Sequence, residues 1–410
     1  MFEAFDRSGT GSSKWARAGT GRIALGLADM DLSGPPAVGA ALAARAGHRA
    51  FGYTVCDPGG RQLVAAWYRR RHGVEVDPDW VLLLPFGPRT AVRLLLEAAA
   101  PRGPVVFGSP EWGGFGPVCR AAGLPYREVP LIPTEDGYRL PLAEFTRLRP
   151  GAVLVSSPHN PSGRLWQAAE IRALAELAAQ CGGLLISDEV HGDLVHPDAG
   201  ARHPVAVAVA AGAGPGAGRG ASAGGGSAEA VRCTVTLNSV GKTFNTSGIP
   251  SCFALVPDER LRERLVAVMA GYGLWEGGLL EQVAQRAALA EGEEWLEGLL
   301  RHLVAARDLA LTALGDGDGG GGGHGGAVLA RPQASYLLWL DAAALGRRAG
   351  LAADLPPDRT RAALLTQRDV ELADGSDFGA AGHGRLRLNY ALPLARLRLA
   401  LTRLTSAEGL

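Results

Sequence analysis

Short apolar runs recur along the chain, and each one ends at a polar or turn-forming residue. The five clearest runs lie at residues 81–84, 105–107, 153–155, 184–186 and 233–237. Runs of this length fit strands that are buried on both faces of a mostly parallel sheet. Residues 167–180 carry apolar side chains at helical spacing and stop at two glycines, so they predict a helix. The alternation of strands and helices predicts an α/β fold with helices on both faces of the sheet.

The segments that directly follow these runs carry the candidate chemistry, because open α/β sheets bind ligands beyond the carboxyl ends of their strands. Four of these segments contain a tryptophan, an asparagine, an aspartate and a lysine, namely Trp112, Asn160, Asp188 and Lys242. The remaining segment, after residue 84, reads PFGPRT and opens a helix. Taken singly these residues are ordinary, since a strand-end lysine is usually a solvated charge and a strand-end aspartate usually caps a helix or a turn.

As a set, the four side chains are the groups that a pyridoxal phosphate cofactor needs. The cofactor needs an amine for covalent attachment. It needs a carboxylate against its pyridine nitrogen, so that the protonated ring can draw electrons from a bound substrate. It also needs a donor to its phenolic oxygen and a flat group against its ring. The ordered set therefore predicts a pyridoxal phosphate site at this edge of the sheet.

The composition gives no support to a nucleic-acid or membrane partner, since 41 basic side chains are balanced by 41 acidic ones. No apolar run approaches the roughly 18–20 residues that a membrane span requires. The first residues, MFEAFDRSGT, are polar and lack the apolar region of a signal peptide. Five scattered cysteines without a CxxC pair are typical of reduced thiols in a cytoplasmic protein. The nine histidines show no HxxxH or HExxH spacing, so we expect no metal site.

Two stretches, residues 211–228 and 315–326, are dominated by glycine and other small residues. A chain of this kind recovers little of its ordering entropy by burying side chains. We therefore expect flexible surface loops between ordered elements. The alternative, a polyglycine phosphate cradle, is weaker because neither stretch opens a helix with apolar periodicity.

Several segments carry a resemblance to a known family. SSPHNPSGRLW, SDEVHGDLV and NSVGKTFN resemble the signature segments of the class I/II (fold type I) aminotransferase superfamily of pyridoxal-phosphate enzymes, and most closely its cystathionine β-lyase-like branch. DRSGTGSSKW, LADMD and RLRLNYALP also resemble that branch, in the same order, from about residue 6 to residue 393. The resemblance implies a large domain at residues 46–270, with a mostly parallel sheet sandwiched by helices. It also implies a smaller α+β domain made of residues 1–45 and 271–410.

The resemblance assigns roles to individual residues. It makes Lys242 the lysine that binds the cofactor covalently and Asp188 the carboxylate that pairs with the pyridine nitrogen. It makes Asn160 the amide that donates to the phenolic oxygen. His191, three residues after Asp188, stands where aminotransferases usually have tyrosine and this branch has histidine. A structural turn histidine is the alternative for this position.

Two further positions follow from the same resemblance. Arg387 matches the arginine that binds the substrate α-carboxylate, and its planar guanidinium suits bidentate binding. Arg385 is the neighbouring competitor, which we expect to be a solvated strand residue. Tyr53 matches the tyrosine that reaches the phosphate of the neighbouring subunit, with an ordinary core aromatic as the alternative. The resemblance implies a homodimer whose cofactor sites lie at the subunit interface.

The sequence departs from the family pattern around the cofactor ring and phosphate. Trp112 stands where the family usually stacks a tyrosine on the ring, so the flat surface is kept and the hydroxyl is lost. A core tryptophan remote from the cofactor is the alternative. Gly241 replaces the serine that is common before the lysine, and Pro250 replaces a polar or basic residue. Ser239 keeps the hydroxyl three residues before Lys242.

The first phosphate loop is also altered, because the family's usual glycine is displaced and Gly87 is followed by Pro88 and Arg89. Proline fits the first position of a helix, so the backbone N–H groups that follow it can still bind an anion. Arg89 offers a compensating positive charge, with a surface-facing arginine as the alternative. Gly87 and Arg89 are therefore candidate cofactor-binding residues.

The resemblance favours a carbon–sulfur β-lyase, which eliminates a thiol from cystathionine or another S-substituted cysteine and yields pyruvate and ammonia. An aminotransferase shares the first proton removal and stays an open alternative. A tailoring enzyme of specialised metabolism is a third reading. Such an enzyme would cleave a bulky S-cysteinyl conjugate or carry out a decarboxylating deamination, which the altered phosphate loop and Trp112 keep open. A regulator on the same fold is disfavoured, because the chain has no appended helix-turn-helix and no basic patch.

Overall fold

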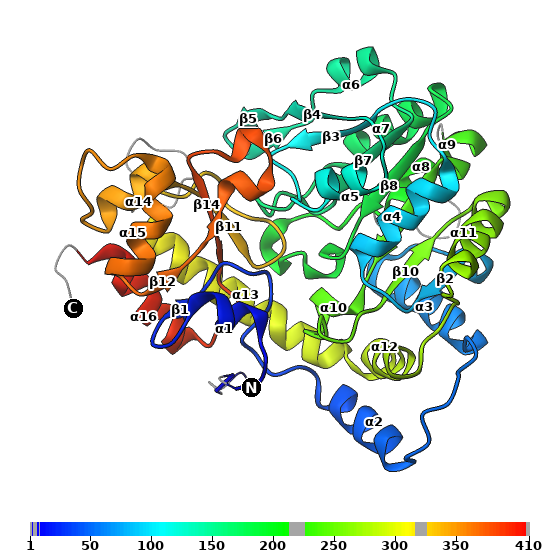
Figure 1. The fold of residues 1–410 in the computed structure, drawn as a ribbon, viewed down its shortest axis with the longest axis horizontal. Helices are drawn as coiled ribbons and strands as arrows, with labels where there is room; N and C mark the ends of the chain where they lie inside the picture. The colour runs from blue at the N-terminus through cyan, green and yellow to red at the C-terminus, as the bar shows by residue number, and fades with distance from the viewer. Residues whose placement is uncertain (1, 3–5, 8, 213–225, 316–325, 407–410) are drawn as a thin grey trace.

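The computed structural model describes residues 2, 6–7, 9–212, 226–315 and 326–406. Most of the two glycine-rich stretches, residues 213–225 and 316–325, lies outside the described residues, so their prediction as loops stays a prediction. Within the described ranges, no helix is both long enough and apolar enough to cross a membrane. Figure 1 shows a large α/β body on one side of the molecule and a smaller group of helices and strands beside it.

The large body is built on a seven-stranded sheet. In spatial order the strands are β2 (Val81–Leu84), β10 (Cys252–Leu255), β9 (Thr234–Asn238), β8 (Leu184–Asp188), β7 (Ala152–Ser156), β3 (Val105–Ser109) and β4 (Tyr126–Pro130). Neighbouring strands from β9 to β4 are parallel, whereas β10 is antiparallel to both of its neighbours. The five apolar runs of the sequence form β2, β3, β7, β8 and β9, which confirms those predictions. β4 and β10 were not predicted.

Helices cover both faces of this sheet, as the strand–helix alternation predicted. One face packs against α4 (Pro88–Ala99) and α11 (Glu259–Gly271), and the opposite face packs against α7 (Ala168–Gln180) and α8 (Ala206–Ala210). Every residue of β3, β7, β8 and β9 is buried, which is why these strands read as continuous apolar runs. The helix predicted over residues 167–180 is α7, with Gln167 as its N-cap in a reciprocal capping box with Glu170.

The smaller body joins the two ends of the chain. A three-stranded sheet of β11 (Leu337–Asp341), β14 (Arg385–Asn389) and β13 (Ala373–Asp374) packs near the long helix α13 (Glu293–Leu314) and α16 (Leu394–Thr405). The short strand β1 (Ile23–Ala24) pairs in parallel with β12 (Val370–Glu371), so an N-terminal segment lies beside the C-terminal part (Figure 1). The grouping of residues 1–45 with 271–410 into one domain stays a prediction.

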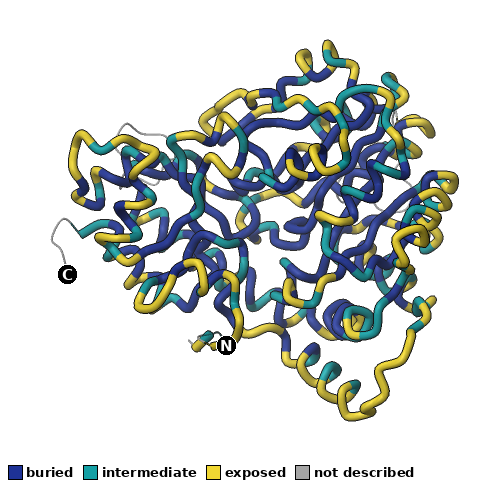
Figure 2. Tube along the Cα trace, in the orientation of Figure 1, coloured by how far each residue is buried: buried dark blue, intermediate teal, exposed yellow. Residues whose placement is uncertain are grey.

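The proposed boundary between the two domains is crossed by packing contacts. Helix α12 (Leu279–Glu291) contacts both α2 (Pro36–Gly47) and α3 (Pro58–His72). The segment that links α2 to α3 is largely exposed along its whole length (Figure 2). It carries exposed apolar side chains at Phe51, Tyr53 and Val55. An exposed apolar strip of this kind is a candidate protein contact.

We predict that removal of residues 213–225 leaves the fold intact. The described ends of this segment meet, because a Cβ built on Gly226 would lie 2.4 Å from the Ala211 carbonyl carbon. If residues 213–225 are replaced by about four residues, the connection between residues 212 and 226 becomes shorter. Closure entropy changes slowly with length, so the free energy of unfolding should change by roughly 1 kcal/mol or less. Chemical denaturation and cofactor binding measure this, and a protein that loses either cooperative unfolding or the cofactor contradicts it.

Candidate active site

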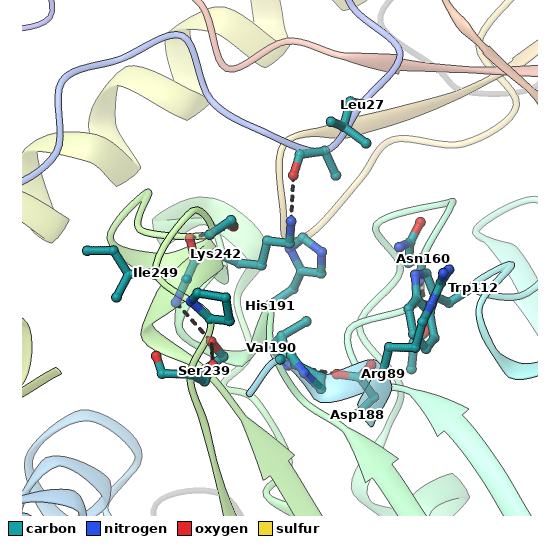
Figure 3. Close-up of a pocket in the computed structure, with 18 of the residues that line it drawn as sticks. Leu27, Arg89, Trp112, Asn160, Asp188, Val190, His191, Ser239, Lys242 and Ile249 are labelled. Carbon is teal, nitrogen blue, oxygen red and sulfur yellow. Dashed lines mark hydrogen bonds between the residues drawn. The ribbon is translucent and has the colours of Figure 1, made fainter. Parts of the chain in front are cut away.

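A cavity of about 310 Å³ opens at the carboxyl edge of the central sheet, where β7, β8 and β9 end side by side. Nine of the ten residues singled out from the sequence line it (Figure 3). They are Gly87, Arg89, Trp112, Asn160, Asp188, His191, Ser239, Lys242 and Arg387. Parallel strands deliver their carboxyl ends to one edge of a sheet, which is why side chains from distant parts of the chain converge here.

Lys242 lies in α10 (Val240–Thr243), a short helix that follows β9 directly. Its Nζ donates a hydrogen bond of 2.6 Å to the Ala28 carbonyl oxygen. Burial lowers the pKa of Lys242 to about 8, although the charges of Asp29 and Asp188 work in the opposite direction. An amine that loses its proton near neutral pH is a nucleophile and a base at physiological pH.

The sequence contains only two lysines, and Lys242 is the one that lines this cavity. The other, Lys14, is fully buried elsewhere, where its Nζ forms an ion pair of 3.0 Å with Asp31. Burial lowers the pKa of Lys14, and Asp31 opposes that shift. A paired ammonium inside the protein is not available for covalent chemistry. Lys242 is therefore the lysine that is available for covalent attachment of the cofactor.

Asp188 ends β8 with its side chain 5% exposed. Within the described residues its carboxylate accepts one hydrogen bond, from the Val190 N–H at 3.3 Å, and has no ion pair. Burial raises the pKa of Asp188 to about 7, opposed by the Val190 hydrogen bond and by Lys242. A buried carboxyl with so few partners is costly to ionise. A cation placed against it, such as a protonated ring nitrogen, would supply the missing counter-charge.

Arg387 and Asn160 are bound to each other across the cavity. Arg387 Nη1 donates to Asn160 Oδ1 at 3.0 Å, and Nη2 donates to the Gly26 carbonyl oxygen at 2.8 Å. The guanidinium carbon lies 4.7 Å from the centre of the Phe378 ring. Because Oδ1 is already an acceptor here, the Asn160 amide group is left with its N–H donors for a ligand.

The neighbouring arginine behaves differently. Arg385 pairs with Asp341, and both side chains are about one-third exposed. It does not line the cavity. By contrast, burial lowers the pKa of Arg387 to about 10, which still leaves it charged at neutral pH. Arg385 and Arg387 are two residues apart and so share one face of β14, but Arg385 lies at the start of the strand beside Asp341, whereas Arg387 lies at the cavity.

His191 follows β8 and is held as a neutral imidazole. Burial lowers its pKa to about 3, and the positive charges of Lys242 and Arg387 lower that pKa further. Its Nδ1 is 3.0 Å from Ser335 Oγ, and its ring meets the Tyr336 ring edge-on with centroids 5.5 Å apart. The contact with Ser335 therefore fixes one ring nitrogen. The ring both packs against Tyr336 and lines the cavity.

Trp112 forms part of the cavity wall and is half-buried. Its ring lies edge-on to Phe115, and the Arg89 guanidinium sits 5.4 Å from its centroid. Figure 3 shows Trp112, Arg89 and Asn160 on one side of the cavity. The structure thus brings the indole to the same cavity as Lys242 and Asp188 instead of leaving it in a remote core.

The end of the cavity predicted to take the phosphate combines two helix starts. Gly87 is the N-cap of α4, Pro88 its first residue, and the exposed Arg89 its second. Ser239 is the N-cap of α10, where its Oγ accepts from the Gly241 N–H at 3.0 Å and donates to the Ser251 carbonyl oxygen at 2.6 Å. Helix starts present free N–H groups to an anion. The Ser239 hydroxyl must break its hydrogen bond to the Ser251 carbonyl oxygen before it can donate to a phosphate.

Tyr53 is the one predicted site residue that lies outside this cavity. Its side chain is 96% exposed, and its ring contacts Trp275 with centroids 5.8 Å apart. It is therefore neither a core aromatic nor a wall of the site in its own chain.

Three residues that support the site were not singled out from the sequence. Ala28 acts through its backbone carbonyl, which carries no side-chain signal. Ser335, which holds His191, lies 144 positions away from it in the chain. Glu111 precedes Trp112 and its carboxyl is buried, whereas a glutamate in a turn is usually solvated. Its place at a strand end was the one available hint.

Comparison with known proteins agrees with this arrangement. Residues 22–404 match the family described as aminotransferase class I and II. Cystathionine beta-lyase PatB of Bacillus subtilis is 29% identical over 98% of both chains. N-succinyldiaminopimelate aminotransferase of Mycobacterium tuberculosis superposes with a TM-score of 0.74 at 26% identity, covering 94% of this chain and 93% of that one. Cystalysin of Treponema denticola, whose structure contains pyridoxal 5'-phosphate, superposes with a TM-score of 0.85 at 22% identity, over 99% and 97% of the chains.

The cavity fits pyridoxal phosphate on the structure's own terms. The amine of Lys242 loses its proton readily, and Asp188 is a buried carboxyl that lacks a cationic partner. Asn160 keeps its N–H donors free of Arg387. Two helix starts lie at the wall where an anion would bind. Lys242, Asp188 and Asn160 are thus each in a state that suits the cofactor contact predicted for them.

We predict that borohydride reduction of the cofactor-bound protein fixes pyridoxal phosphate to Lys242 alone. Attachment should become faster as the pH rises through about 8, because the neutral amine is the reacting form and the pKa of Lys242 is lowered to about 8. Peptide mapping and absorbance measure the two outcomes, with Lys242→Ala as the unlabelled control. Label on Lys14, or attachment that accelerates only near pH 10, contradicts the assignment.

We also predict that Trp112→Phe keeps most of the affinity for pyridoxal phosphate and that Trp112→Ala does not. A stacked ring contributes about 0.5–1.5 kcal/mol beyond burial, so the alanine variant should bind the cofactor about three- to tenfold more weakly. Titration of the apoprotein measures the dissociation constants. An alanine variant with unchanged cofactor affinity and turnover would place Trp112 outside the cofactor contacts.

Proposed function

Because the chain belongs to the class I and II aminotransferase family, in its cystathionine β-lyase-like branch, and uses pyridoxal phosphate, we propose that it is a carbon–sulfur β-lyase. The substrate would be cystathionine or another S-substituted cysteine, and the products a thiol, pyruvate and ammonia. The observation that carries the proposal is the meeting of Lys242, Asp188 and Arg387 in one cavity. These groups suffice to bind an amino acid and remove its α-proton.

Bound pyridoxal phosphate supplies an electron sink for the charge left at the substrate α-carbon. Lys242 would be freed from the cofactor when the substrate amine takes its place, and its Nζ would then be the base, because its lowered pKa, about 8, makes it a proton acceptor near neutral pH. Asp188 would hold the ring nitrogen in its protonated form, since an anion beside that nitrogen favours the cation. The neutral His191 lines the same cavity and adds no charge of its own.

Arg387 binds the substrate carboxylate and so orients the α-hydrogen toward Lys242. Its hydrogen bond to Asn160 Oδ1 ties the substrate-binding group to the group proposed to contact the cofactor ring. Once the α-proton is on Lys242, the electron pair forms the Cα–Cβ double bond as the Cβ–S bond breaks, and sulfur leaves as a thiolate. Water then hydrolyses the released enamine to pyruvate and ammonia.

Elimination is favoured over amino transfer by the extent of the similarity. Cystathionine beta-lyase PatB matches along 98% of both chains. Aminotransferase relatives share the same fold and the same first proton removal, so the geometry of the cavity is compatible with both reactions. Amino transfer and the tailoring of a bulky S-cysteinyl conjugate are therefore the two alternatives that the assay has to separate.

We propose further that the protein works as a homodimer with cofactor sites at the subunit interface. The exposed strip at Phe51, Tyr53 and Val55 would lie on the second subunit, with Tyr53 reaching that subunit's phosphate site. Gly87, Ser239 and Arg89 would hold the same phosphate from within the chain. A cytoplasmic location is proposed as well, because all five cysteines are free thiols.

The proposed reaction is tested by product analysis. We expect stoichiometric thiol and pyruvate from cystathionine or an S-substituted cysteine, with no keto acid required. Amino-acid panels with 2-oxoglutarate or pyruvate as acceptor should yield little amino transfer. Lys242→Ala is the control and should abolish product formation. Acceptor-dependent keto-acid formation without thiol release would instead establish an aminotransferase.

A further inference from the structure

Glu111 is a buried acid behind the cavity wall for which the proposed reaction has no use. Its side chain is 3% exposed, and it does not line the cavity. We propose that Glu111 is a positioning residue that holds the Trp112 segment and the Asn160 turn in register with each other. The proposal rests on the cofactor contacts assigned above to Trp112 and Asn160, and it does not depend on which reaction is catalysed.

The carboxyl group bridges two strand ends. Glu111 Oε1 accepts a hydrogen bond of 2.7 Å from the Trp112 N–H, and Oε2 accepts one of 3.2 Å from the Ser156 N–H. Ser156 Oγ bonds to Glu111 Oε1 and also accepts a hydrogen bond of 2.9 Å from the Asn160 N–H. One side chain thus connects the segment after β3 to the turn after β7.

The backbone of the same segment is fixed to the smaller body. The Glu111 N–H donates to the Phe378 carbonyl oxygen at 2.9 Å, and the Phe378 ring lies under the Arg387 guanidinium. Two residues later, Gly113 packs closely against the backbone of Asp377. A Cβ atom at Gly113 would lie 1.8 Å from the Asp377 carbonyl oxygen. Glu111 therefore lies where the segment after β3, the turn after β7 and the Gly375–Phe378 segment meet, and the first two of these carry Trp112 and Asn160.

Loss of the hydrogen bonds to the Glu111 carboxyl group should be energetically costly. Buried N–H groups that lose their acceptor cost more than the hydrogen bond itself contributed. Burial raises the pKa of Glu111 to about 8, and the hydrogen bonds from Ser156 and Trp112 oppose that shift. The charged group that faces it from β8 is Asp188, which raises its pKa as well. His159, on the turn after β7, is neutral near pH 7 because burial lowers its pKa to about 4.

Glu111→Gln keeps the length of the side chain but has one acceptor oxygen in place of two, so it can accept from the Trp112 N–H or the Ser156 N–H but not from both. Glu111→Asp keeps both acceptor oxygens but is shorter by one methylene, so it cannot reach Trp112 and Ser156 together. Each variant therefore breaks the bridge in a different way.

The experiment measures the dissociation constant of pyridoxal phosphate by titration of the apoprotein, which needs no substrate. Both Glu111 variants are made in the natural background and in the Trp112→Ala background. We expect Glu111→Asp to weaken cofactor binding about tenfold in the natural background and by about threefold or less in the alanine background. Glu111→Gln, which loses one of the two backbone hydrogen bonds, should also weaken cofactor binding more in the natural background than in the alanine background.

Glu189→Asp is the matched control. Glu189 is another fully buried acid, whose carboxylate bonds to the Ala206 N–H, Thr236 Oγ1 and His203 Nε2, none of which lines the cavity. Its shortening should change cofactor affinity by the same factor in both backgrounds. Far-UV circular dichroism and thermal unfolding confirm that each variant is folded.

Two results overturn the proposal. They are an equal loss of affinity for Glu111→Asp in both backgrounds and an unchanged affinity for Glu111→Asp. If Glu111→Asp does not fold, Glu111→Gln decides in the same way: an equal loss in both backgrounds, or no loss, overturns the proposal, and a loss confined to the natural background supports it. If Trp112→Ala alone leaves the affinity unchanged, the cofactor contact of Trp112 is wrong and the premise of the proposal falls with it. The product assay is unaffected by any of these results.

Discussion

The parallel pairing of β7, β8 and β9 is the constraint from which the site follows. Their register places Ser156 beside Asp188 and Asp188 beside Leu237, so the three strands end in one row. Asn160 lies four residues beyond the first of these positions, and Lys242 lies five beyond the last. Because a shift in strand register would move every one of these side chains, the apolar packing on both faces of the sheet also fixes the chemistry at its edge.

The cavity brings together ionisable groups whose charged forms are more stable in water. Within the described residues, not all of them have an ion-pair partner. Lys242, Asp188 and Arg387 each have a pKa moved toward the neutral form by burial. Such an arrangement weakens the fold and is typical of functional sites. A bound cofactor would relieve part of this cost, since its ring nitrogen and phosphate bring charges that match Asp188 and the two helix starts. Cofactor binding is therefore expected to contribute to stability as well as to chemistry.

The sequence was informative where side chains alone determine the outcome. The buried strands β2, β3, β7, β8 and β9 could be predicted because their apolar runs are continuous, and the strand-end residues then followed from the rule for α/β sheets. Strand β10 has the same length as β2 but was not singled out, and its antiparallel direction could not be predicted because a short apolar run gives no sign of its direction or its partner. The contacts of Lys242 with Ala28 and of His191 with Ser335 could not be predicted, because they join residues 214 and 144 positions apart through a backbone oxygen and a small hydroxyl.

One contact described above sets an order of events during synthesis. Arg387 reaches back to the Gly26 carbonyl oxygen, 361 positions earlier, and β14 supplies that arginine close to the end of the chain. A nascent chain that has emerged through residue 255 already contains every strand of the large sheet, with Asp188 and Lys242 in place. It still lacks Arg387, the residue proposed to bind the substrate carboxylate. The ribosome must therefore make nearly the whole polypeptide before this arginine can complete the cavity.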